Sequence, residues 1–213
     1  MKKLIYVVTL VHLTLFNLLS AWNVSVSNSV GDGAFGLFDE NGTLVDGSTT
    51  ENIRIGSFNS FDAQSAWDVG DLSAIDSNFA GYGDSFGMND FNSGVNGIFE
   101  NAIDEPVAAG LEGDSIVLWA TNGGAFTASS AQHLIYEFDK VFPEEPAGPS
   151  DLTLGVDNGS FIAGEFGNFS NDFGMGGGEK DGFNTVSAVP EPSTYAALVG
   201  LCVFVFVSFR RRR

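Results

Sequence analysis

Ser85 stands in a pattern that could supply a catalytic nucleophile. Residues 83–87 (Gly-Asp-Ser-Phe-Gly) fit the G-x-S-x-G spacing, in which a sharp turn between a strand and a helix exposes a serine for acyl transfer. That reaction also needs a general base, and His133 is the only histidine beyond His12. The segment 88–92 (Met-Asn-Asp-Phe-Asn) forms helices poorly, so a glycine-rich surface loop is the better interpretation. Since no spacing singles out a carboxylate pair for glycoside hydrolysis, we predict no catalytic residues and no enzymatic activity.

Oxygen-bearing side chains in two glycine-rich segments could instead bind calcium. Ca²⁺ takes about six to eight oxygen ligands, and loops rich in Asp, Asn and Gly can provide them. The candidate ligands lie in a hairpin and in a longer loop: Asp39, Asn41, Asp46, Asp84, Asn89 and Asp90. Neither segment follows the EF-hand spacing, and Asx-rich turns usually serve the turn itself. We therefore expect no cofactor and keep calcium binding as an alternative.

Three aromatic residues, Trp67, Trp119 and Tyr136, could stack on sugar rings. Trp119 belongs to the continuous apolar run 116–120, which favours a place in the core. Trp67 lies in a polar segment that we interpret as a loop. It is therefore the best candidate for a carbohydrate contact.

The elements that position these residues are predicted to be short strands. Apolar residues alternate with polar ones at period two, and Gly, Asn and Asp separate the runs. The predicted strands cover residues 22–26, 33–38, 43–45, 53–58, 116–120, 134–138, 152–156 and 161–166. One short helix is expected where Leu72, Ile75 and Phe79 fall at i, i+3 and i+7 behind a capping Asp71. These patterns predict an all-β fold, an antiparallel β-sandwich or jelly-roll of about eight short strands with one short helix.

The charge of the chain is strongly acidic, with 27 Asp and Glu against 9 Lys and Arg and a formal net charge of −18. All the acidic residues lie between Asp32 and Glu191, where the only basic residues are Arg54, Lys140 and Lys180. Such a surface repels nucleic acid, so we expect no nucleic-acid partner. Solubility outside the cell is the favoured interpretation, and attraction of divalent or basic partners is the alternative.

The N-terminal residues have the pattern of a secretory signal. A basic start at residues 1–3 precedes an apolar run at residues 4–19, and Ala21 is a small residue at the expected cleavage position. We predict a helical signal peptide over residues 1–21, recognised by the secretion machinery. A retained N-terminal anchor is the alternative, because the apolar run contains polar residues.

The C-terminal residues combine a Pro-Glu-Pro segment, an apolar run and a basic cluster. Each proline lacks an N–H donor and cannot continue a helix. The uncharged residues 195–209 span about 22 Å as a helix, which is short for the roughly 30 Å of hydrocarbon in a bilayer. The basic cluster is predicted to stop export and keep this end in the cytoplasm. Its members are Arg210, Arg211, Arg212 and Arg213.

This order of features resembles the PEP-CTERM sorting signal. The matching motif residues are Val189, Pro190, Glu191, Pro192 and Ser193. The resemblance implies that an exosortase, a membrane-embedded thiol peptidase, cuts near Glu191–Pro192 and passes the body to a surface acceptor. A permanent single-pass anchor is the alternative.

Four segments follow from these patterns: a signal peptide (1–21), a β-sandwich-like extracytoplasmic domain (22–166), a Gly/Asn-rich flexible stalk (167–188) and a sorting tail (189–213) with a transmembrane helix over 195–209. We expect export through the cytoplasmic membrane of a bacterium, transient anchoring in that membrane, and release to the cell surface or medium. The predicted function is that of an exported structural protein of the cell surface or extracellular matrix. The alternative is a carbohydrate- or calcium-binding module with exopolysaccharide as its partner.

Overall fold

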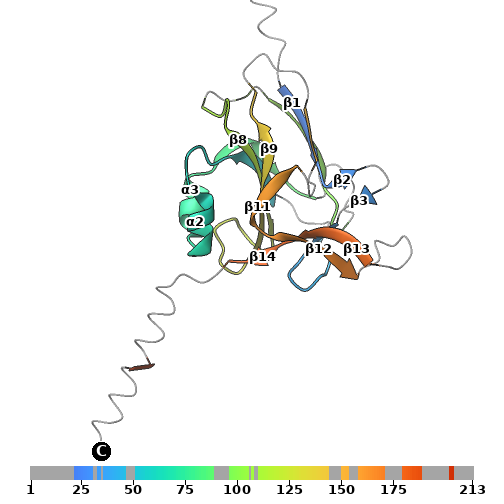
Figure 1. Ribbon diagram of the computed structural model, residues 1–213, viewed down its shortest axis with the longest axis vertical. Coiled ribbons are helices and arrows are strands. Elements are labelled where there is room, and N and C mark those ends of the chain that lie inside the picture. The colour runs from blue at the N-terminus through green and yellow to red at the C-terminus, as the bar shows by residue number, and fades with distance from the viewer. Residues whose placement is uncertain are drawn as a thin grey trace, which may run out of the picture.

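A computed structural model describes residues 22–30, 33–34, 36–46, 51–88, 96–105, 107, 110–143, 150–153, 158–170, 179–188 and 202–203. Within these ranges the chain forms strands β1 to β14 and the short helices α2 and α3, as Figure 1 shows. The all-β prediction is therefore confirmed. The expected number of strands was too low, because many strands are too short to leave a pattern in the sequence.

The largest sheet is antiparallel and has the order β11-β9-β8-β5-β6, with β14 as a further partner of β9. The apolar run 116–120 lies in β8, at the centre of this sheet. Its side chains are buried on both faces of the sheet, as its sequence predicted. The strands are β5 (Ile53–Ser57), β6 (Ala80–Phe86), β8 (Ser115–Asn122), β9 (Gln132–Val141), β11 (Gly159–Ala163) and β14 (Val186–Ser187).

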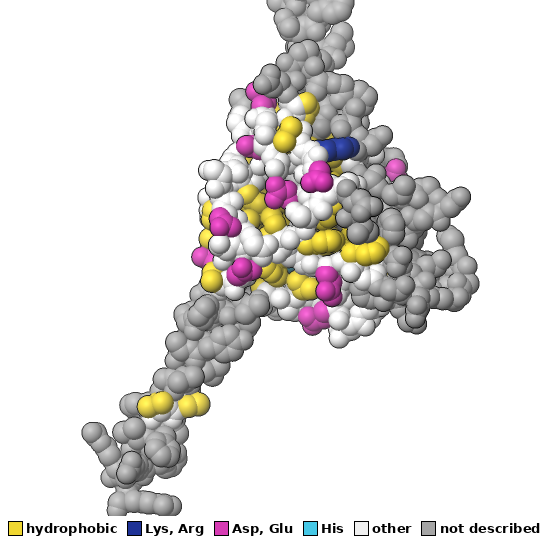
Figure 2. All heavy atoms as spheres, in the orientation of Figure 1, with side chains coloured by type: hydrophobic (Ala, Val, Ile, Leu, Met, Phe, Trp, Pro, Cys, Tyr) yellow, Lys and Arg dark blue, Asp and Glu magenta, His cyan; other side chains and the backbone are white. Residues whose placement is uncertain are grey.

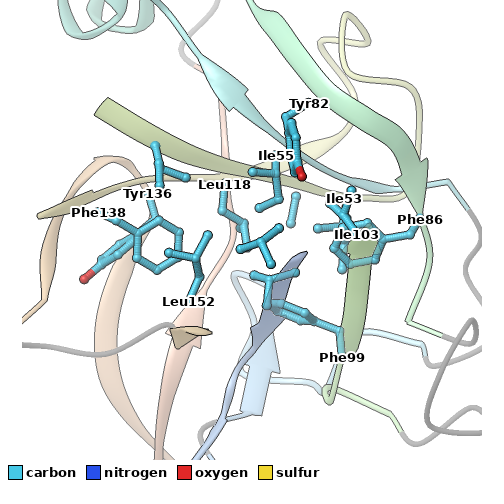
Figure 3. Close-up of a cluster of buried hydrophobic side chains, with 14 of the residues drawn as sticks. Ile53, Ile55, Tyr82, Phe86, Phe99, Ile103, Leu118, Tyr136, Phe138 and Leu152 are labelled. Atoms are coloured by element: carbon cyan, nitrogen blue, oxygen red, sulfur yellow. The ribbon is translucent and has the colours of Figure 1, made fainter. Parts of the chain in front are cut away.

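A second sheet has the order β10-β1-β7 and shares a core with the first. Its strands are β1 (Trp22–Ser27), β7 (Glu100–Glu105) and β10 (Ser150–Thr153). Figure 3 shows the shared core, in which side chains such as Ile103 and Leu152 of this sheet meet Ile55 and Leu118 of the larger one. Each fully buried aliphatic or aromatic side chain here stabilises the fold by about 1.5 to 3 kcal/mol. The two sheets thus share one core, but β1 pairs with β10 in parallel, so the strand pairing is not wholly antiparallel as predicted.

The remaining strands of the described chain form two smaller sheets. One has the order β12-β13-β4, with β13 and β4 parallel, and the other pairs β2 with β3. Their strands are β2 (Ser29–Val30), β3 (Gly33–Ala34), β4 (Gly36–Phe38), β12 (Glu165–Ser170) and β13 (Glu179–Asn184). Phe183 of β13 is fully buried against the ring of Tyr136. The predicted flexible stalk over 167–188 is therefore wrong where β12, β13 and β14 occupy it, and the folded part extends past residue 166.

Two helices cover the face of the large sheet that the second sheet leaves open. They are α2 (Ala63–Asp68) and α3 (Leu72–Ser77), each capped by an Asp side chain that accepts a backbone N–H bond. The predicted helix corresponds to α3. The segment of Trp67 was expected to be a loop and is instead α2, which is followed by the C-cap Val69 and by Gly70 with a φ of 75°.

Among the described residues, no helix is long and apolar enough to span a bilayer. The predicted signal helix over 1–21 lies outside the described residues. So does the predicted transmembrane helix over 195–209, apart from Cys202 and Val203, whose backbone is helical.

Candidate functional site

The last strand of the body is fixed to the large sheet immediately before the predicted sorting motif. β14 pairs with the start of β9, with Val186 opposite His133 and Ser187 opposite Gln132. The next residue, Ala188, is only 8% exposed and packs in the apolar cluster beneath the helices. The backbone position of residue 188 is therefore set by the folded body.

Side-chain hydrogen bonds hold this junction from a second direction. The backbone N–H of Thr185 donates to the Phe38 carbonyl oxygen at 2.8 Å, and its hydroxyl lies 3.1 Å from the same oxygen. The Thr185 hydroxyl is also 3.1 Å from Oε1 of Gln132. The Ser187 hydroxyl donates to the Glu40 carboxylate at 2.8 Å. The junction thus joins β14 to β9 and to the turn that follows β4.

The residues of the sorting motif, 189–193, lie outside the described residues. The same holds for the arginine cluster 210–213 and for Ala21 at the predicted signal cleavage position. Their roles remain predictions from the sequence.

Arg54 occupies a cage of aromatic rings on the helix-covered face of the sheet. Its guanidinium carbon lies 4.0 Å from the ring centroid of Phe126, 4.1 Å from that of Trp119 and 4.3 Å from that of Phe79. Its Nη2 donates to Oδ1 of Asp76 at 2.7 Å. Burial lowers the pKa of Arg54, while the hydrogen bond and charge of Asp76 oppose that shift. Three ring faces and one carboxylate thus surround this cation, its buried Nε makes no hydrogen bond, and the side chain serves the packing of the body.

His133 is fully buried beside this cage. Its Nδ1 accepts a hydrogen bond from Trp119 Nε1 at 3.2 Å, and its Nε2 lies 3.4 Å from the Ala128 carbonyl oxygen. This geometry assigns the ring proton to Nε2. Burial lowers the pKa of His133 to about 4, with a smaller lowering from the charge of Arg54, against a hydrogen bond with Ala128 that raises it. The imidazole is therefore neutral at physiological pH.

Ser85 and His133 do not form a catalytic pair. Ser85 is exposed within the edge strand β6, and His133 lies on β9, with β5 and β8 between them. Three strand spacings separate the two strands by about 14 Å, which is far beyond hydrogen-bond reach. Residues 83–86 of the pattern also lie in β6, and no helix follows Gly87 in the described residues 87–88, so the pattern is not a turn between a strand and a helix there.

The candidate calcium ligands that the structure describes do not form an ion site. Oδ1 of Asp39 accepts the backbone N–H groups of Asn41 at 2.9 Å and Thr43 at 2.7 Å, so this carboxylate closes its own turn. Asp84 lies in strand β6, not in a loop as expected, and Asn89 and Asp90 lie outside the described residues. Among the described residues, no group of three or more His, Cys, Asp or Glu side chains could hold a metal ion. Calcium binding remains a hypothesis.

The three aromatic candidates for sugar stacking are buried. Trp67 is 8% exposed and packs edge-on against His133, with ring centroids 5.7 Å apart. Trp119 is fully buried, as its apolar surroundings predicted. Tyr136 is also fully buried, and its hydroxyl donates to Asn158 Oδ1 at 2.7 Å. The prediction that Trp67 is available to a carbohydrate is wrong, because α2 folds it onto the sheet.

A hollow of about 200 Å³ lies at the opposite end of the large sheet from β14. Its polar lining comes from hydroxyl, amide and carboxylate side chains: Ser57, Asn59, Asp62, Gln64, Ser115 and Glu137. Its apolar lining comes from Phe58, Phe61, Ala63, Val117 and Ile162. Hydrogen bonds from Ser65 lower the pKa of Asp62, so this carboxylate at the hollow is ionised. The hollow could not be predicted, because its residues come from separate segments of the chain that have no distinctive pattern.

An acidic all-β body whose last strand ends directly before a Pro-Glu-Pro segment is organised as a folded cargo with a C-terminal sorting tail. Acidic side chains are scattered over the face of the body in Figure 2. Residues 188–213 match the family model of the PEP-CTERM protein-sorting motif, which confirms the resemblance seen in the tail. The motif marks the chain as an exosortase substrate exported to the cell surface or extracellular space of a bacterium. No curated protein and no solved structure matches the chain.

Proposed function

We propose that the chain is a structural protein of the bacterial cell surface or extracellular matrix, without catalytic activity of its own. In this proposal, residues 195–209 hold the exported chain in the membrane until an exosortase cuts near Glu191–Pro192. The observation that carries the proposal is the sorting-motif match over 188–213. The fixed position of Ala188 supports it, because a cut near Glu191–Pro192 leaves β14 and the large sheet with the released body.

Replacement of the two motif prolines tests the sorting role. Pro190→Ala/Pro192→Ala removes the φ restraint that each proline ring imposes on the motif, so we expect the chain to stay in the inner membrane. Pro146→Ala/Pro149→Ala is the matched control, since it also changes two prolines but leaves the motif intact. The two forms are compared by fractionation of cells and by intact mass of the surface protein. Wild-type surface protein that still carries the peptide Arg210–Arg213 would refute the proposal in favour of a permanent anchor.

A second candidate function, binding of a carbohydrate of the extracellular matrix, is favoured by the hollow at the end of the sheet. Sugars need paired hydrogen-bond donors and acceptors beside an apolar ring, and the hollow combines amide and carboxylate groups with the half-buried ring of Phe61. A volume of about 200 Å³ suits one sugar unit of a chain rather than a large ligand.

Phe61→Ala tests this second function. The loss of one stacking face is expected to weaken binding of purified exopolysaccharide roughly tenfold. Val69→Ala is the control, because Val69 is 45% exposed and does not line the hollow. Thermal unfolding of both variants checks that the body remains folded. Equal binding by wild type, Phe61→Ala and Val69→Ala would remove the hollow from consideration.

A further inference from the structure

We propose that the loop between β8 and β9, residues 123–131, is the face of the body that lies against anionic lipid headgroups while the tail is anchored. This inference rests on the proposed function, because it requires the tail to be in the membrane. Beyond the proposed function, the body then has a defined orientation, with this loop as the surface in contact with the lipid. Residues 123–131 form this β8–β9 loop.

The β8–β9 loop lies directly beside the point where the tail begins. The loop runs into Gln132 and His133, the residues that pair with β14. Ala188 follows β14 and is buried, so the tail leaves the body next to this loop. In Figure 1, β14 lies at the lower end of the large sheet, far from β1 at the top.

The length of chain between body and membrane is short. Residue 188 is fixed, and the apolar run of the tail starts at residue 195. A fully extended chain covers at most about 25 Å over that distance. The headgroup layer on one side of a bilayer accounts for about 5 to 7 Å of it. The end of the body that carries β14 must therefore stay close to the headgroups, whatever path the connecting residues take.

The β8–β9 loop has the charge pattern that suits this position. Residues 115–136 contain no Asp, Glu, Lys or Arg, and no other stretch between residues 22 and 188 is as long without a charge. The rest of the body is strongly acidic, and anionic headgroups would repel it. The exposed positions of the β8–β9 loop are small or polar residues: Gly123, Gly124, Ala125, Thr127, Ser129 and Ser130. At the junction the exposed Glu40 accepts a hydrogen bond from the Ser187 hydroxyl.

The β8–β9 loop is also held in place by contacts with the sheet. The Phe126 ring lies 4.0 Å from the Arg54 guanidinium carbon and packs edge-to-face against the Trp119 ring, with ring centroids 5.2 Å apart. The Thr121 hydroxyl donates to the Gly124 carbonyl oxygen at 3.0 Å. The loop therefore presents a fixed, uncharged surface rather than an open end of the sheet.

Site-specific quenching tests the orientation directly. The exported precursor, residues 22–213, carries Cys202→Ser and one new cysteine for a fluorophore, either Ser129→Cys in the loop or Ser60→Cys as control. Ser60 is equally exposed but follows β5 at the end that pairs with the start of β8, opposite the loop. The protein is reconstituted into vesicles of phosphatidylethanolamine and phosphatidylglycerol that carry a headgroup-attached quencher.

We expect the label at residue 129 to be quenched several-fold more than the label at residue 60. Equal quenching at both positions, or stronger quenching at residue 60, would overturn the inference. Flotation of the vesicles is measured on the same samples. Protein that fails to float with the vesicles would refute membrane anchoring and with it the proposed function, whereas protein that floats without the difference in quenching refutes the orientation alone.

A charge substitution gives a second, independent readout in cells. Ser130→Asp places one negative charge on the loop, and we expect the rate of tail removal to fall roughly fivefold, the effect of one charge at an anionic membrane surface. Ser60→Asp adds the same charge at the far end and is expected to leave the rate unchanged. Equal rates for the two variants would contradict the inference.

Discussion

Acidification is expected to destabilise the body through His133. Protonation of its Nδ1 would place a hydrogen toward the Trp119 indole N–H, which now donates to that nitrogen at 3.2 Å. Two donors would then face each other in a fully buried site beside the Arg54 cation. The neutral ring is therefore the form that the fold accepts.

The magnitude follows from the two pKa values. In the unfolded chain the pKa of His133 is near 6.5, and burial lowers it to about 4 in the folded state. The unfolded state therefore binds the proton first, so stability is full above pH 6.5 and is lost as the pH falls toward about 4. At about 1.4 kcal/mol per pH unit, the loss amounts to about 2 kcal/mol at pH 5 and about 3 kcal/mol at pH 4.

Urea unfolding of residues 22–188 at pH 7 and pH 5 measures this loss. His133→Asn is the matched variant, because its Oδ1 can accept the Trp119 bond but does not titrate. The many carboxylates titrate in both proteins, so they cancel in the difference of the two unfolding free energies. We expect the advantage of the wild type over the variant to shrink by about 2 kcal/mol between pH 7 and pH 5. The same pH dependence in both proteins would refute the role given to His133.

Three further predictions follow from the described contacts. Arg54→Lys loses the planar stacking on three rings and should lower the unfolding free energy by about 1 to 2 kcal/mol in urea, whereas the exposed Lys140→Arg should change it by less than about 0.5 kcal/mol. Millimolar calcium should raise the melting temperature of the body more than magnesium or sodium if Asp and Asn side chains bind it, and equal rises would leave only screening of an acidic surface. Purified body should turn over no generic ester, and turnover that disappears in both Ser85→Ala and His133→Ala would overturn the non-enzymatic assignment.

The parts of the fold that the sequence predicted are those with a local cause. The run 116–120 forms the central strand because five consecutive apolar residues can be buried on both faces. The turn at 39–42 forms because Asp39 caps it and Gly42 accepts a φ of 77°. Helix α3 forms because Leu72 and Ile75 share one face behind a capping Asp71. In each case the residues that determine the structure lie within one turn or one strand.

The parts that the sequence missed depend on distant partners. Strand β13 has the sequence Glu-Lys-Asp-Gly-Phe-Asn, which has no strand pattern, and it forms because it pairs with both β12 and β4 and buries Phe183. Helix α2 is only six residues long and shows no apolar period, yet the sheet provides a site for Trp67. Tertiary contacts override weak local propensity in both elements.

The same distinction separates the sorting signal from the rest of the candidate site. The PEP-CTERM motif could be recognised because all its residues are consecutive in the sequence, within 188–213. The Arg54 cage could not be predicted, because its three rings come from separate segments of the chain. Phe79 follows α3, Trp119 lies in β8 and Phe126 lies in the β8–β9 loop. The hollow likewise combines side chains from four separate stretches of chain.

The proposed orientation and the proposed ligand site are consistent with each other. Strand β8 starts at Ser115, which lines the hollow, and ends at Asn122, just before the β8–β9 loop. Its eight residues span about 26 Å. A body anchored with the β8–β9 loop at the headgroups therefore holds the hollow away from the membrane, open to polymers outside the cell. Removal of the tail would free the β14 end without altering the hollow, so a carbohydrate bound there before processing should remain bound after it.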